Sequence, residues 1–352
     1  MFDLPEIWPR DSWNRIETTY SFWQTFMTCR KKCFYRYGLG LVRKKEDRGA
    51  LYIGSLVHRG LDAYYKNNRN EQIAKRAMRE EVLKTDLDDA SRLHLARAEA
   101  MLEGYHRFYQ DDTWMPQFVE ACFSGPIYNM ATGRISRSLS LSGKIDLGAC
   151  PFKEGRIWLY EHKTCEAVGE ELLQRIWTQF QTKLYYAYFR FMNSAEVDPT
   201  DYNVEGIIYN WLGKTRIRAR QGETEAEFLA RKTALEAKTG KKSRAKQQIP
   251  STPEEIHEKV LEELTGEPRK YFHREQVLFD TREIQVILRD LWSLTKDFLA
   301  CQKESRWYQN TDSCFKWGHP CPYYPICSSG GNPNIIHNQY EVLPANQELK
   351  ET

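Results

Sequence analysis

The sequence predicts a single α/β domain in which helices flank a mixed central sheet. Two strand-like segments lie between Leu139 and Thr164, and segments with helical periodicity precede and follow them. The chain has 352 residues, of which 41% are hydrophobic and 28% charged, and this length is enough to bury a substantial core. We therefore expect one domain over residues 1–340 and a flexible tail over residues 341–352.

The first predicted element is a helix over residues 21–42 that combines aromatic and basic side chains. Its apolar side is predicted to consist of Phe22, Phe26, Cys29, Cys33 and Tyr37. Its cations include Arg30, Lys31 and Lys32. Basic residues interleaved with aromatic ones suit a surface that follows phosphates and stacks bases. The alternative is an amphipathic helix whose cationic side chains lie along apolar surface.

The second predicted helix covers residues 54–65 and carries His58, with Leu56, Leu61 and Tyr64 facing the core. A single histidine in a helix is either a structural residue or a metal ligand, and the helix alone leaves both open. A charged helical region is predicted over residues 71–110, with a buried stripe of Leu93, Met101, Leu102, Tyr105 and Phe108. A strand follows over residues 118–128, where Glu120 is either solvated or part of an acidic site.

The two central strands are predicted from period-2 alternation and from aromatic and β-branched residues. The first has an apolar face of Leu139, Leu141, Ile145 and Leu147 and a polar face of Ser140, Ser142, Lys144 and Asp146. Gly155 marks a turn, and the second strand covers residues 157–163. Glu161 and Lys163 are two residues apart in that strand, so their side chains point the same way.

Two carboxylates on neighbouring strands, with an amine beside one of them, are what a divalent metal and an activated water require. Phosphodiester hydrolysis at a useful rate needs the barrier lowered by roughly 20 kcal/mol. One general base supplies about 3–6 kcal/mol of this, so a metal ion must supply much of the rest. Asp146, Glu161 and Lys163 are therefore candidate catalytic residues.

The remaining elements are three helical segments and one strand. A helix over residues 172–192 places Gln181 and Tyr185, four residues apart, on one side, and a strand is predicted over residues 203–210. Residues 214–253 are rich in Lys and Arg and poor in large apolar residues, which favours a solvated helix with a mobile loop, or a flap that contacts phosphates. An amphipathic helix over residues 283–301 is predicted to bury Ile284, Ile287, Leu291, Leu294 and Phe298.

Three of the nine cysteines, Cys314, Cys321 and Cys327, lie in a segment punctuated by Gly and Pro. A four-ligand site needs one more residue. His319 would complete a local zinc knuckle, whereas Cys29 would complete a 4Fe–4S cluster that joins residues 21–45 to residues 312–328. We favour the iron–sulfur cluster, with Cys33 as a substitute for Cys29. The remaining thiols are interpreted as packing residues: Cys122, Cys150, Cys165 and Cys301.

The segments GKID at residues 143–146 and EHK at residues 161–163 resemble the PD-(D/E)XK nuclease superfamily, specifically its RecB-like branch. The proline that precedes the aspartate in that family is replaced here by Ile145. Five motifs from Cys29 to Cys327 are similar to those of nucleases of the AddB and CRISPR-adaptation types, phage-encoded ones included, and occur in the same order. The resemblance implies a restriction-endonuclease-like core whose ends meet at an iron–sulfur cluster.

The resemblance also implies roles for individual residues. Mg²⁺ or Mn²⁺ would be bound by His58, Asp146, Glu161 and the carbonyl group of His162. Lys163 would orient or deprotonate the attacking water. Gln181 and Tyr185 would line the site and contact DNA, and Arg30, Lys31 and Lys32 would add phosphate contacts.

The net charge of +3 is too small to identify a nucleic-acid-binding protein by itself. No apolar run approaches the length of a membrane span, and the N-terminal residues lack the pattern of a signal peptide, so we expect a cytoplasmic protein. The predicted function is metal-dependent exonuclease activity on single-stranded DNA or DNA ends, in recombination, repair or phage DNA processing. The alternative is a non-catalytic iron–sulfur subunit that binds DNA ends beside a recombination or repair partner.

Overall fold

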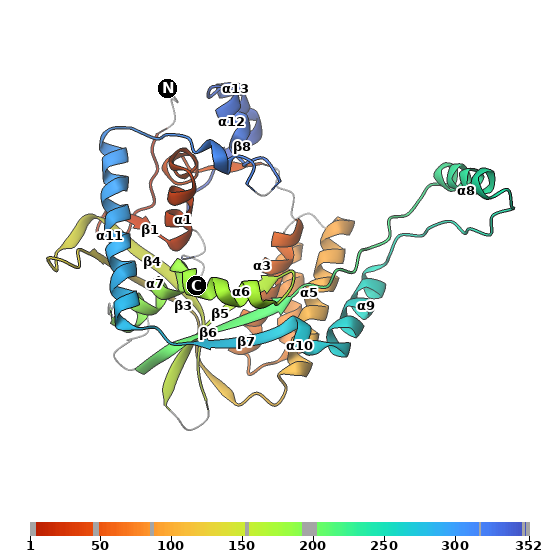
Figure 1. Ribbon diagram of the computed structural model, residues 1–352, viewed down its shortest axis with the longest axis horizontal. Helices are drawn as coiled ribbons and strands as arrows, with labels where there is room; N and C mark the ends of the chain where they lie inside the picture. The colour runs from red at the N-terminus through yellow and green to blue at the C-terminus, as the bar shows by residue number, and fades with distance from the viewer. Residues whose placement is uncertain are drawn as a thin grey trace.

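The computed structural model describes residues 5–44, 49–84, 88–151, 155–191, 203–316 and 318–346, and residue 349. Figure 1 shows three parts: a central sheet covered by helices on both faces, a smaller lobe formed by segments from both ends of the chain, and an arm that projects from the body. The predicted α/β class with a mixed, helix-flanked sheet is confirmed. No helix within the described ranges is both long and apolar enough to span a bilayer.

The central sheet has six strands in the order β1-β4-β5-β6-β7, with β3 paired to β4 off this path. The bounds are β1 Ile16–Thr18, β3 Trp114–Tyr128, β4 Ile135–Pro151, β5 Arg156–Cys165, β6 Asn203–Gly213 and β7 Phe272–Val277. The pairs β1·β4 and β5·β6 are parallel and the others antiparallel, so the sheet is mixed. Gly155 adopts a positive φ of 63° at the turn before β5, as predicted.

Helices cover the two faces of the sheet and enclose two apolar clusters. One face is covered by α3 Gly49–Lys66, α4 Glu71–Leu83, α5 Asp89–Phe108, α9 Pro253–Gly266 and α10 Pro268–Tyr271. The other is covered by α1 Tyr20–Thr28, α6 Glu170–Arg175, the 3-10 turn η2 Ile176–Thr178, α7 Phe180–Phe191 and α11 Thr281–Lys303. The predicted apolar stripes of the helices lie in these clusters, where Leu56, Tyr105, Leu291 and Phe298 are fully buried.

Strand β4 differs from the prediction on both of its faces. Ser140 and Ser142, assigned to a polar face, are buried because β1 covers them: Thr18 Oγ1 donates to the Ser140 carbonyl at 2.6 Å, and Ser142 Oγ donates to Glu17 at 2.9 Å. On the apolar side, Ile145 packs in one cluster and Leu147 in the other. The strand therefore changes face at Asp146, between these two residues.

Two predicted helices are interrupted. The helix expected over residues 21–42 ends at Cys29, whose extended backbone (φ −164°, ψ 118°) separates α1 from α2 Arg30–Cys33, and the π-helix η1 Phe34–Gly38 follows. At this break the Cys29 thiol accepts the backbone N–H of Asn310 at 3.4 Å. The helix expected over residues 172–192 is divided between α6 and α7 at Gln179, which has ψ 104°.

The smaller lobe joins segments from the two ends of the chain. Strand β2 Leu41–Arg43 pairs antiparallel with β8 Tyr340–Val342. Its short helical elements are α2, η1, η4 Thr311–Ser313, α12 Tyr324–Ser328 and α13 Pro333–Gln339. A separate core of Tyr35, Leu39, Leu41, Tyr323, Ile326, Ile336 and Tyr340 fills it. Within the described residues, elements from the two predicted segments, residues 21–45 and 312–328, therefore lie side by side in this lobe.

The tail predicted over residues 341–352 lies partly against the body. Leu343 donates its N–H to the Gly40 carbonyl at 2.8 Å, and Asn346 Nδ2 donates to the Glu17 carbonyl at 3.1 Å. Ala345 and Asn346 are buried. Residues 341–346 are thus part of the fold, because they extend β8 alongside the N-terminal segment.

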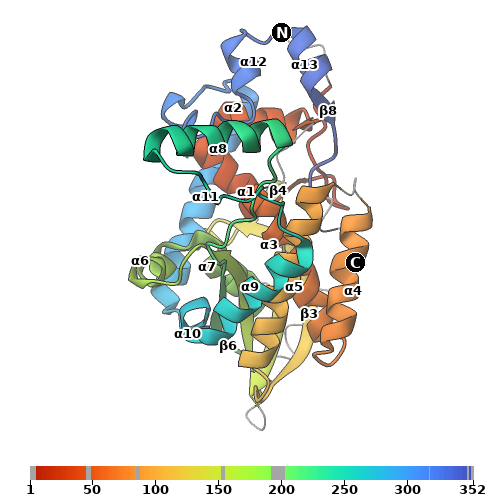
Figure 2. The same cartoon turned by 90° about the vertical axis from the view of Figure 1, so that its right-hand side faces the viewer.

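The basic segment over residues 214–253 forms the projecting arm. Two extended legs carry α8 Glu225–Thr239 at the tip, with Thr224 and Glu227 as a capping box at its start and Gly240 (φ 64°) at its end. The legs are joined by Glu223 N–H to Gln248 O and Ser251 N–H to Arg220 O, both 3.1 Å. No residue of α8 is buried, and Figure 1 shows the helix standing away from the sheet, whereas in Figure 2 the arm points towards the viewer and α8 lies in front of the body.

Candidate active site

The centre of the candidate site is the point where β4 and β5 separate. Their antiparallel pairing ends at Leu147↔Tyr160, so Asp146 and Glu161 are the next residue on each strand. The backbone N–H of His162 donates to Asp146 Oδ2 at 2.7 Å and fixes this carboxylate. The structure therefore brings the two predicted carboxylates together.

Lys163 lies beside Glu161 on the same side of β5, as its spacing predicts. Its Nζ is 2.5 Å from Glu161 Oε1 and donates to Gln181 Oε1 of α7 at 3.2 Å. Burial alone would lower the pKa of Lys163, but the carboxylates of Glu161 and Asp146 outweigh it and raise the pKa. Without a metal ion Lys163 is thus a cation that offsets two carboxylates, and Gln181 fixes its position.

His58 projects from α3 towards the same point. Its Nδ1 lies 3.8 Å from Asp146 Oδ2. Burial and the positive charge of Lys163 lower the pKa of His58 to about 4, so the imidazole is neutral near pH 7. A neutral imidazole has a free lone pair, which is the form that binds metal ions.

Asp146 carries the strongest electrostatic perturbation in the site. Burial, followed by the neighbouring carboxylates of Glu161 and Glu120, raises the pKa of Asp146 well above its usual value, although Lys163 acts in the other direction. A divalent cation would remove this repulsion between carboxylates, and two carboxylates with one imidazole are a donor set that suits Mn²⁺ or Mg²⁺. The side chains are not assembled as ligands: no group of three His, Cys, Asp or Glu residues in the described ranges has the geometry of a metal site.

Glu120 lies opposite Asp146 on β3, in a strained backbone. The register Val119↔Leu147 and Ala121↔Ile145 places these two residues across from each other, and Glu120 has a φ of 57°. Left-handed backbone is unfavourable for a residue with a Cβ and is concentrated at functional sites. The Glu120 carboxylate forms an ion pair with Lys144, which brings a third acidic group to the edge of the site.

His162 contributes its backbone to the site, while its imidazole lies on the other side of β5. Its Nδ1 is 2.8 Å from Asn210 Nδ2, and Asn210 also contacts Arg274 at 3.3 Å. Arg274 is held by Asp112 at 2.6 Å and by the ring of Tyr109 at 3.8 Å. The sequence reading missed this polar network, since β7, which carries Arg274, has no clear alternation.

The predicted DNA-contacting residues differ in their exposure. Tyr185 is buried, and its ring meets the edge of Phe123 with ring centroids 5.1 Å apart. Arg30 donates to the Phe26 and Met27 carbonyls and stacks on Phe26 at 4.5 Å, so it caps the end of α1. Lys31 lies 6.0 Å from the Tyr35 ring, and Lys32 is close enough to Cys321 to influence the pKa of that thiol.

The predicted cluster cysteines are neighbours in the smaller lobe. Burial, followed by the adjacent thiols of Cys321, Cys327 and Cys29, raises the pKa of Cys314. The N–H of Cys321 donates to the Cys314 carbonyl at 2.7 Å, which closes the loop between these two residues. Cys33, the predicted substitute for Cys29, is instead completely buried in the main core.

A cavity of about 150 Å³ opens beside Lys163. It is lined by Thr164 and Cys165 at the end of β5, by Gln179 between η2 and α7, and by Trp211 of β6. The Lys163 amine is therefore accessible from the side of α6 and η2.

Two comparisons with known proteins were made for the complete chain. A family model described as the PD-(D/E)XK nuclease superfamily matches residues 17–328. Among curated proteins none matches the chain.

Proposed function

The chain belongs to the PD-(D/E)XK nuclease superfamily, and from this premise we propose that it is a metal-dependent DNA exonuclease acting on single strands or DNA ends. The observation that supports the proposal is the meeting of His58, Asp146, Glu161 and Lys163 where β4 and β5 separate. Nucleases of this superfamily typically use Mg²⁺ or Mn²⁺.

In this proposal Asp146, Glu161 and His58 hold the metal ion, and the carbonyl of His162 is an additional ligand. The bound ion supplies positive charge at the scissile phosphate and lowers the pKa of a water molecule. Asp146 is kept in place by the backbone N–H of His162, so only small movements of side chains are needed to gather the ligands. Glu120 is a candidate for a further carboxylate of the site because it faces Asp146.

Lys163 has two tasks in the proposed mechanism. With a bound cation balancing Glu161 and Asp146, less negative charge would hold the lysine proton, which would suit Lys163 to general base catalysis. In either protonation state Nζ is placed by Gln181 to orient the attacking water. Tyr185, which is buried against Phe123, supports α7 and thereby the position of Gln181.

The resemblance to RecB-like nucleases supports two finer parts of the proposal. It favours exonuclease over endonuclease activity, and it favours recombination, repair or phage DNA processing as the biological setting. The resemblance also carries the proposed 4Fe–4S cluster, which Cys29, Cys314, Cys321 and Cys327 would hold. Four thiolates are the usual ligand set of such a cluster, but within the described ranges no three His, Cys, Asp or Glu side chains are arranged as a metal site, so the resemblance alone supports this part of the proposal.

The alternative is a non-catalytic subunit that binds DNA ends within a complex. The intact set of Asp146, Glu161 and Lys163 argues against it, because a protein that only binds DNA does not need a crowded pair of carboxylates beside an amine. In the absence of a metal ion Asp146 and Glu161 repel each other, and Lys163 only partly offsets this repulsion.

The experiment is digestion of end-labelled linear single-stranded DNA and of closed circular single-stranded DNA, with Mn²⁺ or with chelator. We expect the linear substrate alone to be cleaved, and only with metal. Glu161→Gln and Lys163→Ala should lower the rate by about 10²–10⁴-fold, with DNA affinity preserved. The exposed Glu171→Ala on α6 is the matched control. Near-normal cleavage by Glu161→Gln or Lys163→Ala would refute the assigned site, and cleavage of circles would refute exonuclease action.

A further inference from the structure

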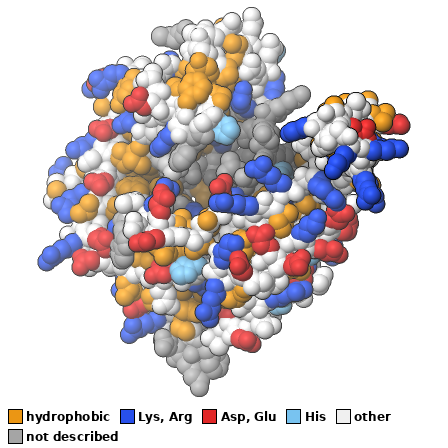
Figure 3. Space-filling model, turned by 45° about the vertical axis from the view of Figure 1, so that its right-hand side comes forward, with side chains coloured by type: hydrophobic (Ala, Val, Ile, Leu, Met, Phe, Trp, Pro, Cys, Tyr) orange, Lys and Arg blue, Asp and Glu red, His pale blue; other side chains and the backbone are white. Residues whose placement is uncertain are grey.

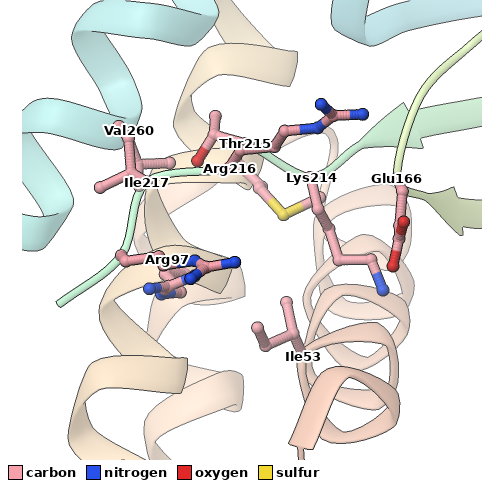
Figure 4. A pocket seen from close by; sticks show the side chains of 10 residues that line it. Ile53, Arg97, Glu166, Lys214, Thr215, Arg216, Ile217 and Val260 are labelled. Carbon is pink, nitrogen blue, oxygen red and sulfur yellow. The ribbon is translucent and has the colours of Figure 1, made fainter.

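A cavity with a volume of about 430 Å³ lies at the foot of the arm. Its walls are Ile53 of α3, Arg97 and Met101 of α5, Val260 of α9, Glu166 after β5, and residues 214–218 of the first leg. Figure 4 shows Lys214 reaching down beside Glu166 and Arg97 pointing into the space below the leg. The cavity thus has four cationic side chains and one carboxylate.

The first leg of the arm separates its cations from its apolar residues. Ile217 and Ala219 are partly buried against the cluster under α3, α5 and α9, whereas Arg216, Arg218 and Arg220 are exposed. Alternate residues of an extended chain are about 6.7 Å apart. The leg therefore presents a regular row of guanidinium groups, which is kept outward because the intervening residues pack on the body.

Arg97 is the second observation that indicates an anionic ligand. The guanidinium is partly buried, and burial is the only influence on its pKa, which is lowered. Among the residues that the structure describes, none forms an ion pair with Arg97. A partly desolvated cation without a counter-charge is costly, and an anion bound in the cavity would remove this cost.

Strands β5 and β6 run from the candidate active site to the edge of the cavity. In their parallel register Lys163 pairs with Trp211 and Cys165 with Gly213, and the N–H of Lys214 donates to the Cys165 carbonyl at 2.8 Å. The row of cations therefore begins where the strand that carries Glu161 and Lys163 ends. Lys214 is three positions beyond the partner of Lys163, which is about 10 Å along the sheet.

The charge of the whole arm points to a polyanionic partner. Residues 214–249 contain eleven Lys and Arg against four Glu, a net charge of +7, whereas the complete chain has only +3. The rest of the protein is therefore net negative. Figure 3 shows Lys and Arg side chains gathered on the arm and on the adjoining surface of the body. Such a concentration of positive charge on one projecting element favours a nucleic-acid backbone.

We propose that the cavity and the row of arginines bind the phosphodiester backbone of a single DNA strand, next to the phosphate placed at Lys163. This inference rests on the proposed function and extends it to the path of the substrate. A cavity of 430 Å³ is the size of a small-molecule site, for which about 300–1,000 Å³ is typical. This volume admits a sugar-phosphate unit of one strand, so we assign the site to single-stranded DNA.

The test is the salt dependence of binding for a fluorescein-labelled dT oligonucleotide, followed by anisotropy in chelator so that no cleavage occurs. For single strands the slope of log affinity against log salt changes by about 0.7 for each phosphate contact. Arg97→Gln should lower the slope by one such step, and the double variant Arg216→Gln/Arg218→Gln by two. Arg97→Lys should restore the wild-type slope. The charge-matched control is Arg289→Gln on the exposed side of α11, which should leave the slope unchanged.

The outcomes separate this inference from the proposed function. The small substrate bis(4-nitrophenyl) phosphate needs the active site but not the cavity, so its cleavage should be lost in Glu161→Gln and kept in Arg97→Gln. An unchanged slope in Arg97→Gln and in the arginine double variant would overturn the inference, whatever the nuclease activity. An equal loss of slope on duplex DNA would overturn the restriction to single strands. If the variants change the salt-dependence slope but the wild-type protein cleaves no substrate, the DNA-binding site is supported and the proposed nuclease activity is refuted.

Discussion

Replacing Asp146 by asparagine should stabilise the metal-free protein, because the site holds more negative charge than it can accommodate without a cation. The change is isosteric, and an asparagine Oδ1 can still accept the N–H of His162 that holds Asp146 Oδ2 at 2.7 Å. Burial and the carboxylates of Glu161 and Glu120 raise the pKa of Asp146 well above its unfolded value of 3.8. Its contribution to stability is therefore fully present below pH 3.8 and is lost as the pH rises through the folded-state pKa.

The magnitude follows from proton linkage. A single group that binds one proton more in the folded than in the unfolded state changes the free energy of unfolding by at most about 1.4 kcal/mol per pH unit. For a domain of this size 1 kcal/mol corresponds to about 1.4 °C in the melting temperature. The melting temperature of the variant should therefore rise above that of the wild type by up to about 2 °C for each pH unit above 4, until the folded-state pKa is passed.

The assay is thermal unfolding in chelator at several pH values between 4.5 and 8, followed by circular dichroism, and repeated with Mn²⁺. Saturating metal at about 100 times Kd should stabilise the wild type by about 2.7 kcal/mol and the variant much less. The control is Asp290→Asn on the exposed side of α11, which should show no such trend. A melting temperature of Asp146→Asn that stays at or below the wild-type value at every pH would refute the crowding of carboxylates.

Three further predictions concern the histidine, the cysteines and the packing of β4. His58→Ala should raise the Mn²⁺ concentration needed for half-maximal cleavage, and an unchanged metal titration would make His58 a structural residue. The protein purified without oxygen should be brown and contain iron and sulfide. Cys29→Ser should lose the iron and sulfide, and Cys301→Ser should keep both. A colourless wild type with one zinc per chain would contradict the cluster. Gly148→Ala should destabilise the protein by about 1–3 kcal/mol, because the new Cβ would lie 2.1 Å from the Phe118 ring. An unaltered unfolding curve would show that this ring moves freely.

The sequence predicted the parts of the site that depend on short-range spacing. Glu161 and Lys163 are two residues apart in one strand, so their side chains lie on the same side of it. In the structure Lys163 Nζ lies 2.5 Å from Glu161 Oε1. The turn at Gly155 and the apolar residues of α3 and α11 were predicted for the same reason, since period and turn chemistry are local properties. The contact between His58 and Asp146 was expected from the resemblance alone, as 88 positions of sequence separate them.

The features that sequence reasoning missed depend on contacts between distant segments. Ser140 and Ser142 look like solvent-facing residues, but both are buried beside β1, more than 120 residues earlier, where Ser142 donates to Glu17 and Thr18 donates to the backbone carbonyl of Ser140. The helix break at Cys29 could not be predicted locally, because neither Gly nor Pro lies next to this residue. Asn310, 281 residues later, donates a hydrogen bond to the thiol at that position. The left-handed φ of Glu120 likewise depends on the opposing strand, and no local pattern at a glutamate predicts it.

The pairing of β2 with β8 means that the smaller lobe can be completed only after all strands of the main sheet have been synthesised. Arg43 leaves the ribosome about 300 residues before its partner Tyr340. At roughly 5–20 residues per second, translation of that interval takes on the order of 15–60 s. Throughout this time Tyr35, Leu39 and Leu41 lack the residues that later cover them, and the main sheet is completed within the interval, because β7 emerges before β8. A nascent chain at this stage exposes an apolar surface beside a nearly finished domain, and that surface is what a chaperone would bind until the final residues emerge.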